Sequence, residues 1–192
     1  DVGANLGSYS MLASGVSKSK SFAFEPVPAT YNRLLQNIEI NQLSNKIITK
    51  PIALTSPKSF LDKKEIRFST DRACANSFVD ENYKGHTTIV DVSTLDKELE
   101  NIDPVLIKID VEGSEEGLLQ GAYETLRKHS MLAIIIEGQS EKIDQYFYDA
   151  GFISVQYLPF VREIKPNSKK RLNKLWVKKN KIELIKTLLQ TA

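Results

Sequence analysis

Sulfur-containing and aromatic indole side chains are scarce in this sequence, and long apolar runs are absent. Its 192 residues include one cysteine, two methionines and one tryptophan. The single Cys74 excludes an internal disulfide and is typical of a reducing compartment, so we expect a cytoplasmic protein. No His/Asn pattern accompanies this cysteine, which disfavours a thiol nucleophile. No apolar run approaches the roughly 20 residues that cross a bilayer, so we expect no membrane span.

Length and composition indicate an ordinary globular domain. Hydrophobic residues make up 41% of the chain and charged residues 26%, which is typical of soluble proteins. We expect one domain over residues 1–192. No secretory signal is visible, and the chain does not begin with Met, so we expect that an upstream segment was removed.

The charge is unevenly distributed. The net charge is +2, but residues 162–192 hold ten Lys/Arg against two Asp/Glu, while the rest holds sixteen against twenty-two. A basic segment of this kind could contact phosphate, an anionic glycan or RNA, or could be a solvated face. We favour the solvated face.

Hydrophobic periodicity predicts alternating strands and helices in the first third of the chain. A helix is expected over residues 6–16, a strand over 21–25 and another strand over 46–54. Between the strands, Pro28 opens a second helix. Its inward face is expected to carry Tyr31, Leu34, Leu35 and Ile38. This order predicts a parallel sheet with right-handed crossovers.

The remaining elements extend this sheet. Residues 71–84 read as a loop near the site, and the predicted strands are 65–68, 87–92, 105–110, 132–137, 152–158 and 172–177. The last two are joined by a basic loop, and a helix over 181–190 ends the chain. We therefore expect a mostly parallel, twisted α/β sheet with helices on both faces and an antiparallel C-terminal strand pair.

The first seven residues, Asp-Val-Gly-Ala-Asn-Leu-Gly, predict a strand end, a glycine turn and a helix start. Gly3 and Gly7 are spaced G-x-x-x-G, and Asn5 stands where a dinucleotide-binding turn needs its middle glycine. A cofactor without a phosphate, such as S-adenosylmethionine (SAM), fits better. Its amino-acid end could meet the helix N-terminus and the Asp1 carboxylate through opposite charges.

An acid follows the next predicted strand at the distance typical of a ribose-binding carboxylate. Glu25 lies 22 residues after Gly3, close to the roughly 20 residues of nucleoside-binding folds. The alternative is a solvated acid at a strand end. If Glu25 binds ribose, Pro26 should lie near the adenine, with Ala53 as part of the opposite wall.

A third cluster of charged residues lies at residues 108–113. Lys108 is unusual in a buried strand because a lone ammonium is costly to bury. Alternation places it on the same strand face as Asp110, with Glu112 in the turn beyond. The alternative is a self-satisfied Lys–Asp pair with Glu112 capping the next helix. With Glu137 these carboxylates could bind Mg²⁺, although no spacing rule makes that specific and we assign no metal.

Together these motifs resemble the FkbM-type methyltransferases. The resemblance rests on residues 1–10, 24–28 with Asn37, 107–115, Thr94-Leu95-Asp96, Gly121 and the run into Glu137, and it covers roughly positions 1–140. It implies a class I, Rossmann-like SAM-dependent fold that transfers a methyl group to a hydroxyl of a sugar or secondary metabolite.

Combining the motifs with the resemblance, we expect Asp110 to be the base or the acceptor of the substrate hydroxyl. Lys108 would tune it, and Glu112 or Glu137 would assist. The cofactor-binding residues are expected to be Asp1, Gly3, Asn5, Gly7, Tyr9, Glu25, Pro26 and Ala53.

Two alternatives and one departure from the family stay open. The basic segment raises the possibility of an RNA acceptor, and an inactive glycan- or protein-binding domain is the non-enzymatic alternative. Family members have an apolar strand before Asp1, so we expect a fragment whose central strand is reduced to its last residues. We expect that its neighbours are left with unpaired backbone groups.

Overall fold

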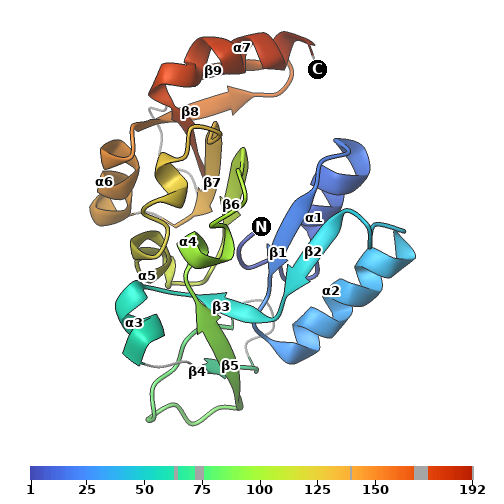
Figure 1. Cartoon of the computed structure of the whole chain (residues 1–192), viewed down its shortest axis with the longest axis vertical. Helices are drawn as coiled ribbons and strands as arrows, with labels where there is room; N and C mark the ends of the chain where they lie inside the picture. The colour runs from blue at the N-terminus through green and yellow to red at the C-terminus, as the bar shows by residue number, and fades with distance from the viewer. Residues whose placement is uncertain (63–64, 72–75, 139, 167–172, 192) are drawn as a thin grey trace.

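Parallel and antiparallel strands form the centre of a computed structural model of the chain, with helices on the flanks (Figure 1). The structure describes residues 1–192 except 63–64, 72–75, 139, 167–172 and 192. Cys74 and the first residue of the strand expected at 172–177 lie outside the described residues.

Two pairs of strands in the main sheet are parallel. β1 (Ser21–Phe24) pairs with β2 (Ile47–Lys50), and β6 (Leu106–Ile109) pairs with β7 (Ala133–Glu137). Helices connect each pair, because parallel neighbours need a crossover. This part of the sheet follows the predicted β-α-β order.

One residue joins these two pairs of strands. Val2 forms parallel bridges to both Phe24 and Ile109. Its backbone N–H donates to the Lys108 carbonyl at 2.9 Å, and its carbonyl accepts from the Asp110 N–H at 3.0 Å. Val2 thus pairs with β1 on one side and β6 on the other. At this position, the expectation that both strands are left with unpaired backbone groups is wrong.

The other side of the main sheet is antiparallel. β10 (Asn173–Lys178) lies between β7 and β8 (Phe152–Leu158) and runs antiparallel to both. β9 (Glu163–Pro166) pairs with β8 inside the segment expected to be a basic loop. The sheet is therefore mixed, and the expectation of a mostly parallel sheet is only partly right.

A three-stranded sheet lies beside the main one. β3 (Ile52–Leu54) runs parallel to β5 (Thr87–Ser93), which pairs antiparallel with β4 (Glu65–Ser69). The single strand expected over residues 46–54 is thus split between two sheets. The break falls at Pro51, which has no N–H to donate to a ladder.

The helices lie on either side of these strands (Figure 1). Figure 1 shows α1 and α2 beside β1 and β2, and α5 and α6 on the other side of β6 and β7. Their bounds are α1 (Ser8–Met11), π-helical η1 (Leu12–Val16), α2 (Pro28–Ile40), α3 (Pro57–Asp62), α4 (Leu95–Glu98), α5 (Glu115–Gln120), η2 (Thr125–Arg127), α6 (Glu141–Asp149), η3 (Lys179–Lys181) and α7 (Ile182–Thr191). Among the described residues, no helix is long and apolar enough to cross a membrane.

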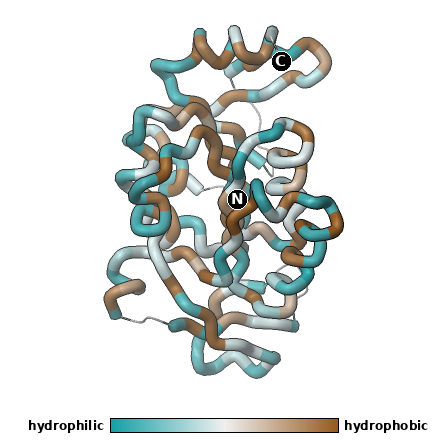
Figure 2. The backbone as a smooth tube through the Cα atoms, turned by 45° about the vertical axis from the view of Figure 1, so that its right-hand side comes forward, coloured by the Kyte–Doolittle hydropathy of each residue, from teal (hydrophilic) through white to brown (hydrophobic). Residues whose placement is uncertain are grey.

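Hydrophobic segments gather along the central strands (Figure 2). The main core lies between β6, β7, β10 and the helices α5 and α6, and includes fully buried Ile109, Phe147 and Trp176. The Phe147 and Trp176 rings are 5.0 Å apart. On α2, Leu34 is buried as expected, whereas Leu35 is 40% exposed and faces away from the core.

Gly3 makes the closest backbone contact in the fold's central turn. Its φ is +74°, and a Cβ at this position would lie 1.7 Å from the Asp110 carbonyl oxygen. Only a residue without a side chain allows the first turn to approach the end of β6 this closely.

We predict that Gly3→Ala destabilises the fold far more than Gly113→Ala. Gly113 also has a positive φ, of +87°, but a Cβ there meets no atom within 4 Å. In Gly113→Ala, only the cost of a left-handed backbone should lower the free energy of unfolding, by about 1–2 kcal/mol. Gly3→Ala adds a steric clash and should lower it by at least about 3 kcal/mol. Urea unfolding measures both, and equal losses would contradict the close approach.

Candidate active site

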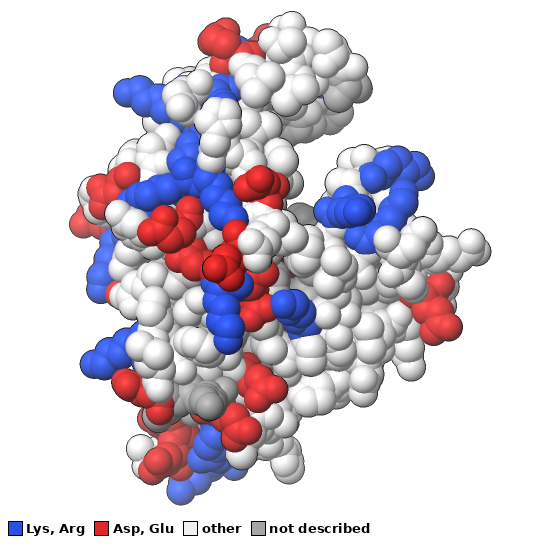
Figure 3. Space-filling view, in the orientation of Figure 1, with Lys and Arg blue, Asp and Glu red and all other residues white. Residues whose placement is uncertain are grey.

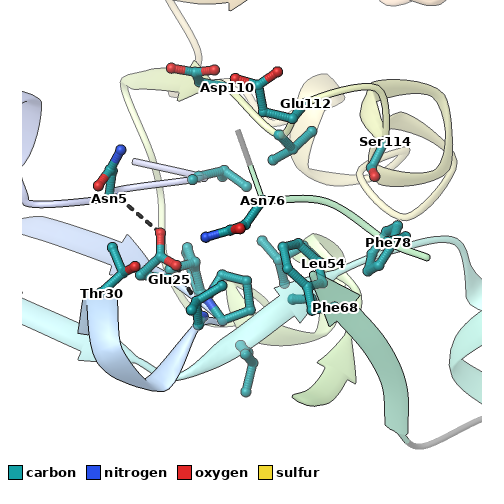
Figure 4. Close-up of a pocket in the computed structure, with 18 residues that line it drawn as sticks. Asn5, Glu25, Thr30, Leu54, Phe68, Asn76, Phe78, Asp110, Glu112 and Ser114 are labelled. Carbon is teal, nitrogen blue, oxygen red and sulfur yellow. Dashed lines mark hydrogen bonds between the residues drawn. The ribbon is translucent and has the colours of Figure 1, made fainter. Parts of the chain in front are cut away.

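A pocket opens where the glycine turn meets the ends of β1, β3 and β6 (Figure 4). Figure 4 shows Asp110, Glu112 and Asn5 toward one side of it, and Leu54, Phe68 and Phe78 toward the other. The pocket therefore has a polar end and an apolar end. Of the residues expected to form the site, those that line it are Gly3, Asn5, Glu25, Pro26, Ala53, Asp110 and Glu112.

The glycine turn is held by hydrogen bonds to the end of β1. The backbone N–H groups of Gly3 and Ala4 both donate to the Phe24 carbonyl, at 3.1 and 3.0 Å. Asn5 then adopts a left-handed conformation, with φ of 49°. Because of this bend, the Asn5 N–H points toward Glu25 rather than continuing a ladder.

Glu25 is the most constrained carboxylate of the pocket. It is only 6% exposed. Oε2 accepts from the Asn5 N–H at 2.9 Å, and Oε1 accepts from the Val27 N–H at 3.0 Å. Burial raises the pKa of Glu25, while the two backbone hydrogen bonds and the Lys108 ammonium oppose that rise. Each oxygen thus has a fixed position and a free lone pair.

Asp1 lies beside the pocket and does not line it. Its Oδ2 accepts from the Ser10 N–H at 3.0 Å and from the Ser10 hydroxyl at 2.7 Å. Its Oδ1 is buried without a hydrogen-bond partner among the described residues. An unsatisfied buried carboxylate oxygen indicates a group that the chain itself does not supply.

Two further expected cofactor residues, Gly7 and Tyr9, also lie outside the pocket lining. A Cβ on Gly7 would lie 2.5 Å from Leu34 Cδ1, so this glycine allows α1 to pack on α2. The Tyr9 ring lies 4.8 Å from the Lys108 ammonium, within the range of a cation–π contact.

Lys108, which is buried, forms an ion pair with the half-buried Asp110. Lys108 is 7% exposed, and its Nζ lies 2.8 Å from Asp110 Oδ2. Asp110 lines the pocket, whereas Lys108 does not. The expected alternation of β6 is therefore confirmed in geometry, since both side chains lie on one face of the strand.

Glu112 lies in the turn after β6, with a strained backbone. Its φ is 46°, and the next residue, Gly113, also has a positive φ. Glu112 is exposed, and a partial loss of hydration raises its pKa, which the nearby carboxylates of Asp110, Glu137 and Glu115 raise further. Glu137, at the end of β7, acts on the site through this charge and does not line the pocket.

The acidic residues do not form a metal site in the part of the chain that the structure describes. No group of three or more His, Cys, Asp or Glu side chains there is placed to hold a metal ion. Among the residues that the structure describes, the Mg²⁺ alternative therefore has no geometric support.

The apolar end of the pocket holds residues that local sequence patterns do not reveal. Phe68 of β4 and Phe78 pack edge to face, with ring centroids 5.1 Å apart. With Thr30, Asn76 and Ser114, they also line the pocket. The only sequence signals for this end were the strand pattern at 65–68 and the placement of the 71–84 loop near the site.

Acidic and basic side chains are mixed on the left part of the displayed face, and a separate group of basic side chains lies at the upper right (Figure 3). Several C-terminal lysines contact the protein itself. Lys174 lies 2.7 Å from Asp144, Lys186 lies 2.8 Å from Glu183, and the Lys178 ammonium lies over the Phe152 ring. For these three lysines, the structure thus shows a partner within the chain.

Comparison with known proteins agrees with this geometry. Residues 1–154 match the Methyltransferase FkbM domain. The chain is also 31% identical over 139 residues to the hexuronic acid methyltransferase AglP of Haloferax volcanii.

That alignment covers 71% of this chain and 54% of the relative, so the chain spans about half the length of the curated relative. No solved structure matches the chain. Because the family match covers most of its length, the chain belongs to the FkbM methyltransferase domain family.

Proposed function

We propose that this chain is a SAM-dependent O-methyltransferase domain that acts on a hydroxyl group of a sugar or glycan. The observation that carries the proposal is the Glu25 carboxylate, fixed by the Asn5 and Val27 N–H groups inside the pocket. A rigid carboxylate beside a glycine turn is suited to bind the two hydroxyls of a ribose.

The strand arrangement supports a class I methyltransferase fold. We propose that Val2 stands for the central strand in the order β2-β1-Val2-β6-β7-β10-β8, with β10 antiparallel. Residues 1–192 would form one such domain. A cytoplasmic location is proposed from the single cysteine.

The residues present fit SAM. Pro26 and Ala53 would bound the adenine together with Phe68 and Phe78, and Glu25 would hold the ribose. The unpartnered Oδ1 of Asp1, beside the first turn of α1, suits the ammonium of the amino-acid end. When bound, SAM supplies an activated methyl carbon for in-line attack.

The chain's own residues would align the acceptor and exclude water. The polar end of the pocket, with Asp110 and Glu112, would receive the acceptor hydroxyl. Carboxylates there can accept its hydrogen bond and orient its oxygen. The apolar end limits water around the cofactor.

The relative's name supports a sugar acceptor, since AglP is a hexuronic acid methyltransferase. The lysine contacts of the C-terminal segment give no support to an RNA acceptor. A small molecule or glycan with free hydroxyls is therefore the proposed partner.

Glu25→Gln should weaken SAM binding about five- to 150-fold. The substitution leaves a ribose hydroxyl or a backbone N–H without its acceptor, which costs about 1–3 kcal/mol. Isothermal titration calorimetry measures the affinity, with Glu39→Gln as a control because Glu39 is an exposed carboxylate of α2. Equal affinities for SAM in the two variants would count against the ribose role.

Incubation with methyl-labelled SAM should label a sugar. Methyl glycosides of a hexuronic acid and of a neutral hexose are the acceptors to compare, with single-stranded RNA as the control. Mass spectrometry should find a gain of one methyl group, and NMR should place it on an oxygen. Tight SAM binding without labelling of either sugar would contradict the proposed acceptor class.

A further inference from the structure

We propose that Glu112, and not Asp110, is the general base of the transfer, and that the Lys108–Asp110 pair is a positioning device. This inference rests on the proposed methyltransferase function. It differs from the sequence-based expectation, in which Asp110 was the first choice.

Asp110 is already engaged by a cation. Its Oδ2 lies 2.8 Å from Lys108 Nζ, and Lys108 is only 7% exposed. The buried Lys108 ammonium holds the Asp110 carboxylate in place through this ion pair. Asp110 is therefore suited to accept a hydrogen bond from the acceptor hydroxyl and to orient it.

Glu112 has the opposite surroundings. It lines the same pocket, and Figure 4 shows its carboxylate on the same side as that of Asp110. Within the described part of the chain, Glu112 takes part in no ion pair with a lysine or arginine. No cation there would lose its partner if Glu112 took a proton.

The charges around Glu112 favour proton uptake. Glu112 is an exposed residue, and partial loss of hydration raises its pKa. The carboxylates of Asp110 at the end of β6, Glu137 at the end of β7 and Glu115 in the first turn of α5 raise it further. A proton on Glu112 removes one of four like charges and so relieves their repulsion. A base with a raised pKa also works closer to neutral pH.

The backbone holds Glu112 in place at a conformational cost. Glu112 and Gly113 have φ of 46° and 87°. The Gly113 N–H donates to Glu115 Oε1 at 3.0 Å, which ties the turn to α5. Left-handed conformations of residues other than glycine are concentrated at functional sites.

The proposed step balances as a substitution. The acceptor oxygen forms a bond to the methyl carbon while the carbon–sulfur bond breaks and its electron pair stays on sulfur. The hydroxyl proton passes to Glu112, giving the methyl ether, S-adenosylhomocysteine and a neutral Glu112, which then releases the proton to water. Asp110 orients the hydroxyl during the transfer.

The first test compares Glu112→Gln with Glu116→Gln. Glu116 is a neighbouring carboxylate on α5 that pairs with Lys142 and does not line the pocket. Glu112→Gln should lower kcat at least about 100-fold, with KM and SAM affinity within about threefold, and Glu116→Gln should match the wild type. A Glu112→Gln enzyme that keeps kcat within fivefold would overturn the assignment.

The second test is the pH dependence. Because the base must be ionised, kcat should rise with pH through the pKa of Glu112. Glu137→Gln removes one like charge, so this rise should move to lower pH. NMR titration of the Glu112 carboxyl carbon in the cofactor-free protein should show that Glu137→Gln lowers the pKa of Glu112 in the same way. If Glu112 were merely structural, its pKa would not be coupled to kcat. An unchanged profile would overturn the proposal.

These outcomes are separate from failure of the proposed function. A wild-type protein that neither binds SAM nor transfers methyl groups defeats the methyltransferase proposal itself. An active wild type that loses activity in EDTA and regains it with Mg²⁺ would instead overturn the base assignment, because the carboxylates would then serve a metal.

Discussion

The backbone hydrogen bonds of Val2 hold the two halves of the pocket together. Val2 bonds to β6 through Lys108 and Asp110, while Gly3 and Ala4 donate to the end of β1. Glu25 and Asp110 belong to different strands, and they face one pocket because this short segment lies between those strands. The missing side chain of Gly3 is what lets the turn approach Asp110 so closely.

Three carboxylates of one pocket are set apart by their neighbours. Glu25 is buried and bonded to backbone N–H groups, Asp110 is paired with a buried ammonium, and Glu112 faces other carboxylates. The same functional group therefore serves three different tasks in the proposed mechanism: binding, orientation and proton transfer. Differences in environment of this kind separate acids from bases in many enzymes.

The three motifs and their order could be predicted from the sequence, because strand ends, glycine turns and acids at strand ends have local sequence patterns. The elements of β1, α2, β6 and β7 were predicted near their observed places. The split at Pro51 and the extra strand β9 were not, since both depend on which neighbour a short strand pairs with. Phe68 and Phe78 were missed for a similar reason, because a separate small sheet brings them to the pocket.

The family and the set of charged residues thus follow from local sequence patterns, in which residue type and spacing carry the information. The role of each charged residue does not, because it depends on contacts between segments far apart in the chain. Lys108 pairs with Asp110 rather than with Glu112, and Glu25 bonds to Asn5, 20 positions away. Ion pairing and like-charge repulsion arise only when the strands meet, and they distinguish the carboxylate that Lys108 pairs with from the one that faces other acids.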